Sequence, residues 1–591
     1  MSTAILAGVP VPGSSLEGDL RSLGFDVRTA ADAAETAKLL TAAPADERVA
    51  VVDTRFVGHL HSLRLALTDP RFAAAAIPGA LTVQPEARPA LDRVRADAGP
   101  GPDALAAALA GAGTPVHRPE LGTLVAEIPH DPQSRHEARA AVAAVDDEAV
   151  RLRTAVKSRD GFFTTYCISP YSRYIARWCA RHGLTPNQVT TASLITALIA
   201  AACAATGTRG GYVAAGVLLL CSFVLDCTDG QLARYSLQYS TLGAWLDATF
   251  DRAKEYAYYA GLALGAARNG DDIWVLALGA MVLQTCRHVV DFSFNEANHD
   301  ATGNNSPTAA LSDKLDSVGW TVWVRRMIVL PIGERWAMIA VLTAVTTPRI
   351  VFYALLVGCA LAACYTTAGR VLRSLTRRAT RTDRAAQALA DLADSGPLAQ
   401  LVARFLRGPR GALPVIAFLG GALVVAASVF APVGSWWPAA AAAVYCVLSG
   451  VAVSRPLKGA LDWLVPPVFR AAEYVTVLAL AARSDVHEAL PAAFGLVAAV
   501  AYHHYDTVYR IKGGTGAPPR WLVRTIGGHD GRTLVVAVLA AVLTAGHTTG
   551  NGFAVALTVL AVAVAIVVLA ESIRFWVSAG APAVHDEGEP A

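Results

Sequence analysis

Long runs of apolar residues dominate the chain after about residue 185. They fall at roughly 188–206, 211–229, 245–266, 272–292, 332–347 and 350–369, and again at 412–431, 436–453, 465–482, 490–508, 533–546 and 552–572. A helix of about 20 apolar residues crosses the hydrocarbon core of a bilayer, which is about 30 Å thick. The pattern therefore predicts a mainly α-helical polytopic membrane protein with about twelve transmembrane helices, six plus six.

Residues 1–150 show a different pattern, in which short β-rich runs alternate with Ala-rich helical stretches. Strands are expected at 3–9, 49–54 and 123–128, and helices at 33–41 and 133–157. Alternation of this kind is typical of layered α/β domains. We expect a soluble cytoplasmic α/β domain ahead of the membrane helices.

Polar segments divide the rest of the chain. Residues 151–184 form a junction, followed by a first membrane domain at 185–375, a cytoplasmic linker at 376–411 and a second membrane domain of unknown role at 412–591. The junction carries arginines and aromatic residues at helical spacing: Arg173, Tyr174, Arg177, Trp178 and Arg181. This spacing favours a helix lying on an anionic membrane face, with a solvated linker helix as the alternative.

Charge predicts the orientation of the chain. Only 16% of the residues are charged against 54% hydrophobic, and the arginine-rich loops all fall on one side of the predicted helices. Such loops face the cytoplasm, which places both termini there. Ala-rich, Lys-poor usage favours a bacterial cytoplasmic membrane. The net charge of +3 and the absence of a basic stripe interleaved with aromatics give no indication of nucleic-acid binding.

Four carboxylates interrupt the second and third apolar runs. Asp226 and Asp229 are three residues apart, and Asp247 and Asp251 are four apart, so each pair shares one helix face. An acidic residue within a membrane helix costs about 2.5–3.5 kcal/mol on insertion scales. A hard divalent cation neutralises such a cluster, because Mg²⁺ and Mn²⁺ favour carboxylate and phosphate oxygens. The pattern predicts a metal site at the cytoplasmic ends of two neighbouring helices.

Small and basic residues at fixed spacing complete the motif. Gly230 and Ala233 leave the backbone open to a ligand, Arg234 suits a phosphate, and Gly243 keeps the next helix thin. The pattern D-x-x-D-G-x-x-A-R-x8-G-x3-D-x3-D is similar to the signature of the CDP-alcohol phosphotransferase (CDP-alcohol phosphatidyltransferase) family, and the resemblance covers about residues 160–375.

The resemblance implies an integral membrane transferase of phospholipid or related biosynthesis. It would move a substituted phosphate from a CDP-linked donor to an alcohol and release CMP, with Mg²⁺ or Mn²⁺. Asp226, Asp229 and Asp247 would hold the metal, and Asp251 would both contribute to it and act as the general base. The donor-binding residues would be Asn187, Thr190, Gly230, Ala233, Arg234 and Ser240, since "LTPNQVT" (184–190) resembles the family's first-helix entry.

The acceptor is less defined. Members that use an inositol phosphate carry extra cations for its phosphate, and Lys254, Arg287, Arg325, Arg326 and Arg370 are available here. Lys254 and Arg287 are the preferred candidates for the acceptor phosphate. The alternative interpretation is that these cations anchor helix ends at the membrane surface.

The N-terminal domain resembles a degenerate nucleotidyltransferase. Its opening, "AILAGVPVPGSSLEGDLRSLGFDV", and "VVDTRF" (51–56) are similar to that fold, and its fusion to such a membrane domain resembles a bifunctional inositol-phosphate cytidylyltransferase architecture, with "KSRDGFFTT" (157–165) as the junction. The loop after the first strand lacks the Gly-x-Gly pattern and the basic residues that would hold a nucleotide triphosphate, so a structural or regulatory role is expected.

The two membrane halves share faint similarities. "DRAKEY" (251–256) with "CRHVVD" (286–291) is similar to "FRAAEY" (469–474) with "YHHYD" (502–506). Coincidence and a decayed duplication both stay open. Two other functions also stay open: a multi-span transporter, since acidic residues in membrane helices serve ion coupling, and an inactive membrane scaffold. The sequence does not choose the donor, the acceptor or the oligomeric state, although homodimers are common in the resembled family.

Overall fold

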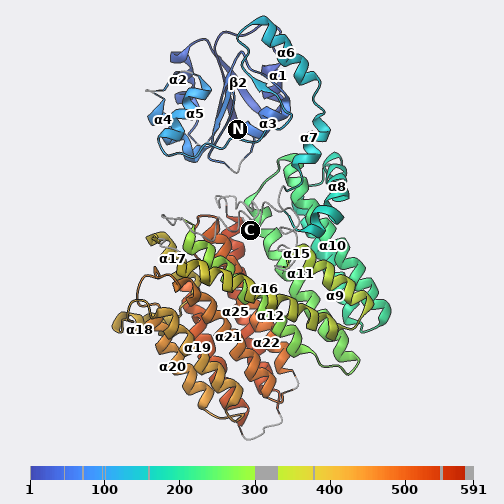
Figure 1. Ribbon diagram of the computed structural model, residues 1–591, viewed down its shortest axis with the longest axis vertical. Helices are drawn as coiled ribbons and strands as arrows, with labels where there is room; N and C mark the ends of the chain where they lie inside the picture. The colour runs from blue at the N-terminus through green and yellow to red at the C-terminus, as the bar shows by residue number, and fades with distance from the viewer. Residues whose placement is uncertain are drawn as a thin grey trace.

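The computed structural model describes residues 2–578 apart from 46, 70–71, 96–97, 100, 158–159, 300–329, 377–379, 487 and 546–549. Within this described part, an α/β domain lies at one end of a large helical body (Figure 1). The expected fold class, a polytopic helical protein with an N-terminal α/β domain, is confirmed.

The N-terminal sheet has five strands in the order β2-β1-β3-β6-β5. The strand β1 (Ser2–Ala7) pairs in parallel with β2 (Phe25–Ala30) and β3 (Arg48–Asp53), whereas β6 (Ala80–Val83) runs antiparallel to β3 and to β5 (Ala74–Ile77). Alternate residues of β1 and β3 enter two separate apolar cores, one on each face of the sheet. A sheet buried on both faces favours apolar strands without alternation.

Helices cover both faces of this sheet (Figure 1). They are α1 (Leu16–Ser22), α2 (Ala33–Ala42), α3 (Leu60–Leu67), α4 (Arg88–Val94) and α5 (Pro102–Gly111), with α6 (Pro132–Ala143) and α7 (Asp147–Thr154) leading to the junction. The helix expected at 133–157 is thus two helices. Of the strand expected at 123–128, only β7 (Ala126–Glu127) forms, paired with β4 (Val57–Gly58).

An amphipathic helix connects the α/β domain to the membrane helices. A π-helical turn (Thr164–Ile168) leads into α8 (Ser169–Arg181). The side chains of Tyr174 and Trp178 are 44% and 54% exposed, and Arg177 pairs with Glu148 at 2.9 Å. The exposed aromatic face fits the expected position on a membrane surface, which stays a prediction.

The helical body consists of two bundles. The first contains α9 (Pro186–Ala205), α10 (Arg209–Ser236), α11 (Thr241–Arg268), α12 (Trp274–Asn298), α15 (Ile332–Val345) and α16 (Pro348–Thr376). The second contains α17 (Asp383–Leu392), α18 (Pro397–Phe405), α19 (Leu413–Phe430), α20 (Trp437–Ala452), α21 (Val465–Arg483), α22 (Ala489–Lys512), α23 (Arg520–Thr525), α24 (Gly528–Leu543) and α25 (Gly552–Val577).

Eight helical segments of the described chain are long and apolar enough to cross a membrane: α9, α10, α12, α16, α19, α21 with the turn before it (Asp462–Arg483), α23 joined to α24 (Arg520–Leu543), and α25. All twelve expected apolar segments form helices, but the count of twelve spans is not confirmed. The helices α15 and α20 have only 14 and 16 residues. The longer α11 and α22 carry several buried charged or polar residues.

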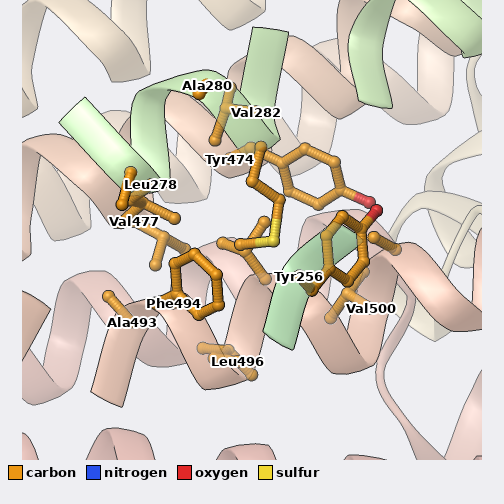
Figure 2. Packing of buried hydrophobic residues seen from close by; sticks show 14 of the residues in the cluster. Tyr256, Leu278, Ala280, Val282, Tyr474, Val477, Ala493, Phe494, Leu496 and Val500 are labelled. Carbon is orange, nitrogen blue, oxygen red and sulfur yellow. The ribbon is translucent and has the colours of Figure 1, made fainter. Parts of the chain in front are cut away.

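The two bundles share one continuous apolar core. Figure 2 shows part of it, where Tyr256 of α11 and Leu278 of α12 pack in the same region as Tyr474 of α21 and Phe494 of α22. The rings of Trp274 and Phe494 meet edge to face, with centroids 5.6 Å apart. The bundles are therefore packed side by side through α11 and α12 on one side and α21 and α22 on the other.

Candidate metal centre

A tight connection places the ends of α10 and α11 next to each other. The helix α10 ends where Leu237 adopts a left-handed conformation (φ 53°). Three residues later Ser240 caps α11, its hydroxyl accepting the Gly243 N–H at 2.9 Å. Side-chain capping of this kind satisfies one of the free N–H groups at a helix start. The last turns of α10 thereby face the first turns of α11.

Three of the four motif carboxylates converge across this connection. Asp226, Asp229 and Asp247 each offer one oxygen, and these oxygens lie within 4.8 Å of one another. The Oδ2 atom of Asp229 is buried and has no hydrogen-bond partner within the described chain. Buried charges without partners are costly, and clustered carboxylate oxygens are the ligands that Mg²⁺ and Mn²⁺ prefer. The three residues fit a divalent cation.

The fourth carboxylate, Asp251, pairs with a buried lysine. The Nζ of Lys254 lies 2.9 Å from Asp251 Oδ1 and also forms an ion pair with Asp226. It donates to the Ser193 hydroxyl at 3.2 Å and lies 5.7 Å from the centre of the Trp336 ring. Lys254 was predicted to bind the acceptor phosphate. Its ammonium instead lies among the carboxylates, with its side chain fully buried.

The predicted donor residue Arg234 lies beside Gly230 on α10. A Cβ added to Gly230 would lie 3.4 Å from Nη1 of Arg234, so a side chain there would crowd the guanidinium. The Nε of Arg234 donates to the Ala155 carbonyl oxygen at 2.6 Å. Ala233, one residue before Arg234, is partly exposed on the same helix. The junction after α7 therefore helps to fix the arginine at the edge of the site.

The other predicted donor residues lie at the start of α9 and α11. A Cβ on Gly243 would lie 2.7 Å from Oδ1 of Asn187, which explains the glycine, because only a bare backbone allows this approach. The hydroxyl of Thr190 donates to the Pro186 carbonyl at 3.0 Å and lies beside Asp229. Asn187, Thr190 and Ser240 therefore border the carboxylate cluster.

The acceptor candidate Arg287 lies away from this cluster, on α12. It is 7% exposed and lies among Asp291, Arg335 and Arg370. Arg370 forms an ion pair with Asp291 and lies over the Phe294 ring, 5.4 Å from its centre. Cations therefore outnumber carboxylates around Arg287. Arg325 and Arg326 lie outside the described residues.

Sequence reasoning missed three features of the centre. Ser193 and Trp336 contact the lysine, as described above. Arg252 pairs with Glu255 at 2.7 Å, and Arg335 of α15 approaches the same Glu255 at 3.4 Å. We call Arg252, Glu255 and Arg335 the first-bundle triad. Its signal in the sequence was the charged residues of "DRAKEY" (251–256) and "GERWAM" (333–338), which interrupt apolar runs.

The α/β domain contacts the end of α10, next to the connection that leads to α11. Arg64 of α3 donates to the Ser236 carbonyl, and Arg151 of α7 lies 5.8 Å from the centre of the Tyr235 ring. Within the domain, Asp53 of the "VVDTRF" segment accepts from Arg55 Nη2 at 2.8 Å. Burial opposes ionisation of Asp53, but the hydrogen bonds from Arg55 outweigh it and lower the pKa of this carboxyl. The degenerate character of the domain stays a prediction.

Comparison with known proteins agrees with the motif. Residues 183–348, which include the four motif aspartates, match the CDP-alcohol phosphatidyltransferase family model. Residues 383–591 match a family of unknown function (DUF5941).

Several curated proteins are similar to about a fifth of this chain. The archaetidylinositol phosphate synthase of Pyrococcus horikoshii is 30% identical over 113 residues, 19% of this chain and 58% of that protein. The phosphatidylinositol phosphate synthase of Mycolicibacterium smegmatis is 35% identical over 133 residues, 22% of this chain and 57% of that protein. A bifunctional IPC transferase and DIPP synthase of Aquifex aeolicus is 30% identical over 128 residues, 21% and 29% of the two chains. In each case the match spans less than two thirds of the relative.

Proposed function

We propose that this protein transfers a substituted phosphate from a CDP-linked donor to an alcohol and releases CMP. The convergence of the Asp226, Asp229 and Asp247 oxygens within 4.8 Å carries the proposal. The similarity to inositol phosphate lipid synthases supports an inositol phosphate as the acceptor and a CDP-linked lipid such as CDP-diacylglycerol as the donor. The reaction would belong to phospholipid synthesis in a bacterial cytoplasmic membrane.

The three converging aspartates would hold the divalent cation, Mg²⁺ or Mn²⁺. When bound, the cation supplies positive charge that neutralises phosphate oxygens and stabilises an in-line displacement at phosphorus. The residues around it bind the donor: Arg234 pairs with phosphate through a planar guanidinium, and Asn187 and Thr190 border the same space. Ser240 and Gly243 keep the start of α11 open to it.

Asp251 would act as the general base. Its oxygen lies 2.9 Å from the Lys254 ammonium, which holds the carboxylate in one orientation. The acceptor hydroxyl gives its proton to Asp251 as its oxygen attacks the donor phosphorus. The bond from phosphorus to the CMP oxygen breaks, and CMP leaves with that electron pair. Arg287 and Arg370 would hold the acceptor's own phosphate at the α12–α16 side.

Purified full-length protein in lipid, with Mg²⁺, provides the test. CMP release would be measured with a panel of CDP-linked donors and with alcohols that do or do not carry a phosphate. We expect CMP release with a CDP-linked lipid and inositol phosphate, and much less with unphosphorylated inositol. Asp251→Asn should lower turnover at least 100-fold, the usual contribution of a general base, while donor binding stays near that of the parent.

Three outcomes would contradict this assignment. Equal loss of donor binding in Asp251→Asn would make Asp251 a metal ligand and not the base. No CMP release with any donor, together with transport of a solute or of protons by the same vesicles, would favour the transporter. Release that persists after Asp226→Asn and Asp247→Asn would separate the activity from the aspartate cluster.

A further inference from the structure

The two bundles contain the same helices packed in the same pairs. In each half of the helical body an amphipathic helix, α8 or α18, precedes six longer helices, and the short α23 lies between the fourth and fifth of these in the second bundle. In the first bundle α9 packs on α10 and α11, and α10 also contacts α8 and α15. In the second α19 packs on α20 and α21, and α20 also contacts α18 and α24. The last two helices pair likewise, α15 with α16 and α24 with α25.

The third helices of the two bundles start with related sequences. Residues 245–256 read WLDATFDRAKEY, and residues 463–474 read WLVPPVFRAAEY. The shared letters are the initial Trp-Leu and the later Arg, Ala, Glu and Tyr. Equal spacing at equivalent positions of the fold makes coincidence a poor explanation.

The second bundle repeats the ion pairs of the first-bundle triad. Arg470 pairs with Glu473 at 2.9 Å, three residues along α21. Arg532, at the start of α24, reaches the same Glu473 at 2.6 Å. The first-bundle triad likewise joins the third helix to the start of the fifth. The second bundle adds Asp394, which pairs with both arginines at 2.9 and 2.8 Å.

The fourth helices also correspond. His288 and Asp291 lie at the same positions from the start of α12 as His503 and Asp506 from the start of α22. In both bundles the aspartate bonds to the sixth helix. Asp291 pairs with an arginine of α16, and Asp506 accepts hydrogen bonds from a serine and a tryptophan of α25.

Among the described residues, the second bundle has no counterpart of the carboxylate cluster. In this alignment Val465 occupies the position of Asp247. Phe469 occupies the position of Asp251, and Ala472 that of Lys254. The helix α10 has 28 residues, and Asp226 comes after the sixteenth of them. Its counterpart α20 has only 16 residues. The helix that would carry the other two carboxylates therefore ends before their position.

The bundles contact each other through equivalent surfaces. The helix α12 packs on α21, and its counterpart α22 packs on α11, while α12 and α22 also touch each other. Arg252 lies over the Tyr505 ring on α22, 5.2 Å from its centre, and the equivalent Arg470 lies beside Cys286 on α12. Reciprocal contacts of this kind define an isologous, two-fold interface between identical subunits.

We propose that residues 397–577 are a second copy of the first bundle that has no metal site, and that this copy takes the place of a partner subunit beside α11 and α12. The chain would thus contain both halves of a dimer, one with the carboxylate centre and one without. A parallel repeat about an axis along the membrane normal is a known arrangement of membrane proteins. It assigns the second membrane domain a role as the built-in partner of the first.

Cross-linking of full-length protein tests the placement. In a variant whose nine cysteines are replaced by serine, Trp274→Cys and Phe494→Cys are combined and treated with a short thiol cross-linker. We expect a link within one chain, so the mass stays at 61.7 kDa. Phe292→Cys with Val508→Cys, from one apolar cluster at the other end of the interface, is a second pair in case the first variant does not fold.

The control pairs Trp274→Cys with Val555→Cys, which is 59% exposed on α25, and should give no link. A product of twice the chain mass from either interface pair would overturn the proposal, because a second chain would then occupy this face. Failure of both folded interface variants to link would overturn it as well.

Mn²⁺ binding followed by electron paramagnetic resonance tests the missing site. The full-length Asp226→Asn/Asp247→Asn variant should lose all saturable Mn²⁺ binding, because both carboxylates belong to the first bundle. A saturable site that persists in this variant and disappears on adding Glu473→Gln would show a metal centre in the second bundle. Neither measurement depends on the catalysed reaction.

Discussion

A single buried lysine offsets the charge of the carboxylate cluster. Lys254 is fully buried and pairs with Asp226 and Asp251, so it neutralises part of the repulsion among the carboxylates around it. Its position one turn beyond Asp251 makes it a part of the metal centre. We therefore interpret Lys254 as a positioning residue for the base, in preference to the acceptor site.

The variant Lys254→Met tests this role. Removal of one partner of a buried ion pair costs about 3–5 kcal/mol, so the variant should unfold several degrees below the parent without metal. Saturating Mg²⁺ should raise its melting temperature more than it raises that of the parent, because the cation then replaces the missing charge. Thermal unfolding in lipid, with and without Mg²⁺, measures both effects.

Lys458→Met is the matched control. Lys458 pairs with Asp383 at 2.7 Å on the surface, with side chains 41% and 95% exposed, and exposed pairs contribute about 0–1 kcal/mol. The control should leave both melting temperatures unchanged. If Lys254→Met kept the parent's stability but needed far more phosphorylated acceptor, Lys254 would be an acceptor residue after all.

The sequence predicted the clustering of three carboxylates, but it did not predict the contacts around them. Asp226, Asp229 and Asp247 were predictable because carboxylates in apolar helices are rare and their spacing places them on one face. The role of Lys254 was not, because its nearest contact outside the motif is Ser193, sixty-one residues away. Such a contact depends on how α9 and α11 pack, which helical periodicity does not specify.

At the scale of elements, the site depends on the close approach of α9 and α11. A Cβ on Gly261 would overlap the Ala201 carbonyl, and one on Gly265 would overlap the Ala204 carbonyl. Small residues four apart let membrane helices pack at backbone distance. Since α11 carries Asp247 and Asp251, the position of these carboxylates depends on this contact.

Gly261→Ala should weaken metal binding, although the substitution lies outside the carboxylate cluster. Overpacking costs about 1–3 kcal/mol, and we expect α11 to shift in order to relieve it. If about 1.4 kcal/mol of this cost reduces the free energy of metal binding, the Mn²⁺ affinity falls about tenfold. Mn²⁺ titration followed by electron paramagnetic resonance measures it. Gly279→Ala is the control, because its Cβ would meet only Leu356 at 3.9 Å. Equal affinities in both variants would show that the contact does not position the carboxylates.

Prediction of secondary structure from the sequence succeeded for the long apolar runs. All twelve expected apolar segments are helical, since runs of this length have one strong interpretation. In the α/β domain β2, β5 and β6 were missed, because strands of four to six residues in Ala-rich sequence resemble helix. The span count differs for two reasons. The helices α15 and α20 are short, and α11 and α22 are buried by the opposite bundle, which allows them more polar residues than a lipid-facing helix.

At the scale of the whole molecule, the distribution of arginines predicts that the carboxylate centre opens to the cytoplasm. Asp226 lies in the half of α10 that ends at Ser236, and Asp251 lies in the half of α11 that begins at Thr241. Arg64 of the α/β domain donates to the Ser236 carbonyl at this end of the helices. Arginine-rich loops lie on this side, and positive loops stay in the cytoplasm. A nucleotide donor made in the cytoplasm would reach the site directly.

Labelling of single cysteines in bacterial cells tests this orientation. In the cysteine-free variant, Lys458→Cys in the α20–α21 connection and Val9→Cys in the α/β domain should react with a membrane-impermeant maleimide only after the cells are opened. Val433→Cys, in the α19–α20 connection, should react in intact cells. All three positions are exposed, at 41%, 74% and 45%, so access to the reagent depends on the side of the membrane and not on burial.

The labelling result also tests the access of the donor to the site and the proposed repeat. If Lys458→Cys and Val9→Cys reacted in intact cells, the carboxylate centre would open to the outside, and a cytoplasmic nucleotide could not supply the donor. If Val433→Cys and Lys458→Cys reacted on the same side, α20 would not cross the membrane, and the second bundle could not be a full copy of the first. Labelling on opposite sides, as predicted, requires that the 16-residue α20 spans the bilayer, because the two connections lie at its two ends.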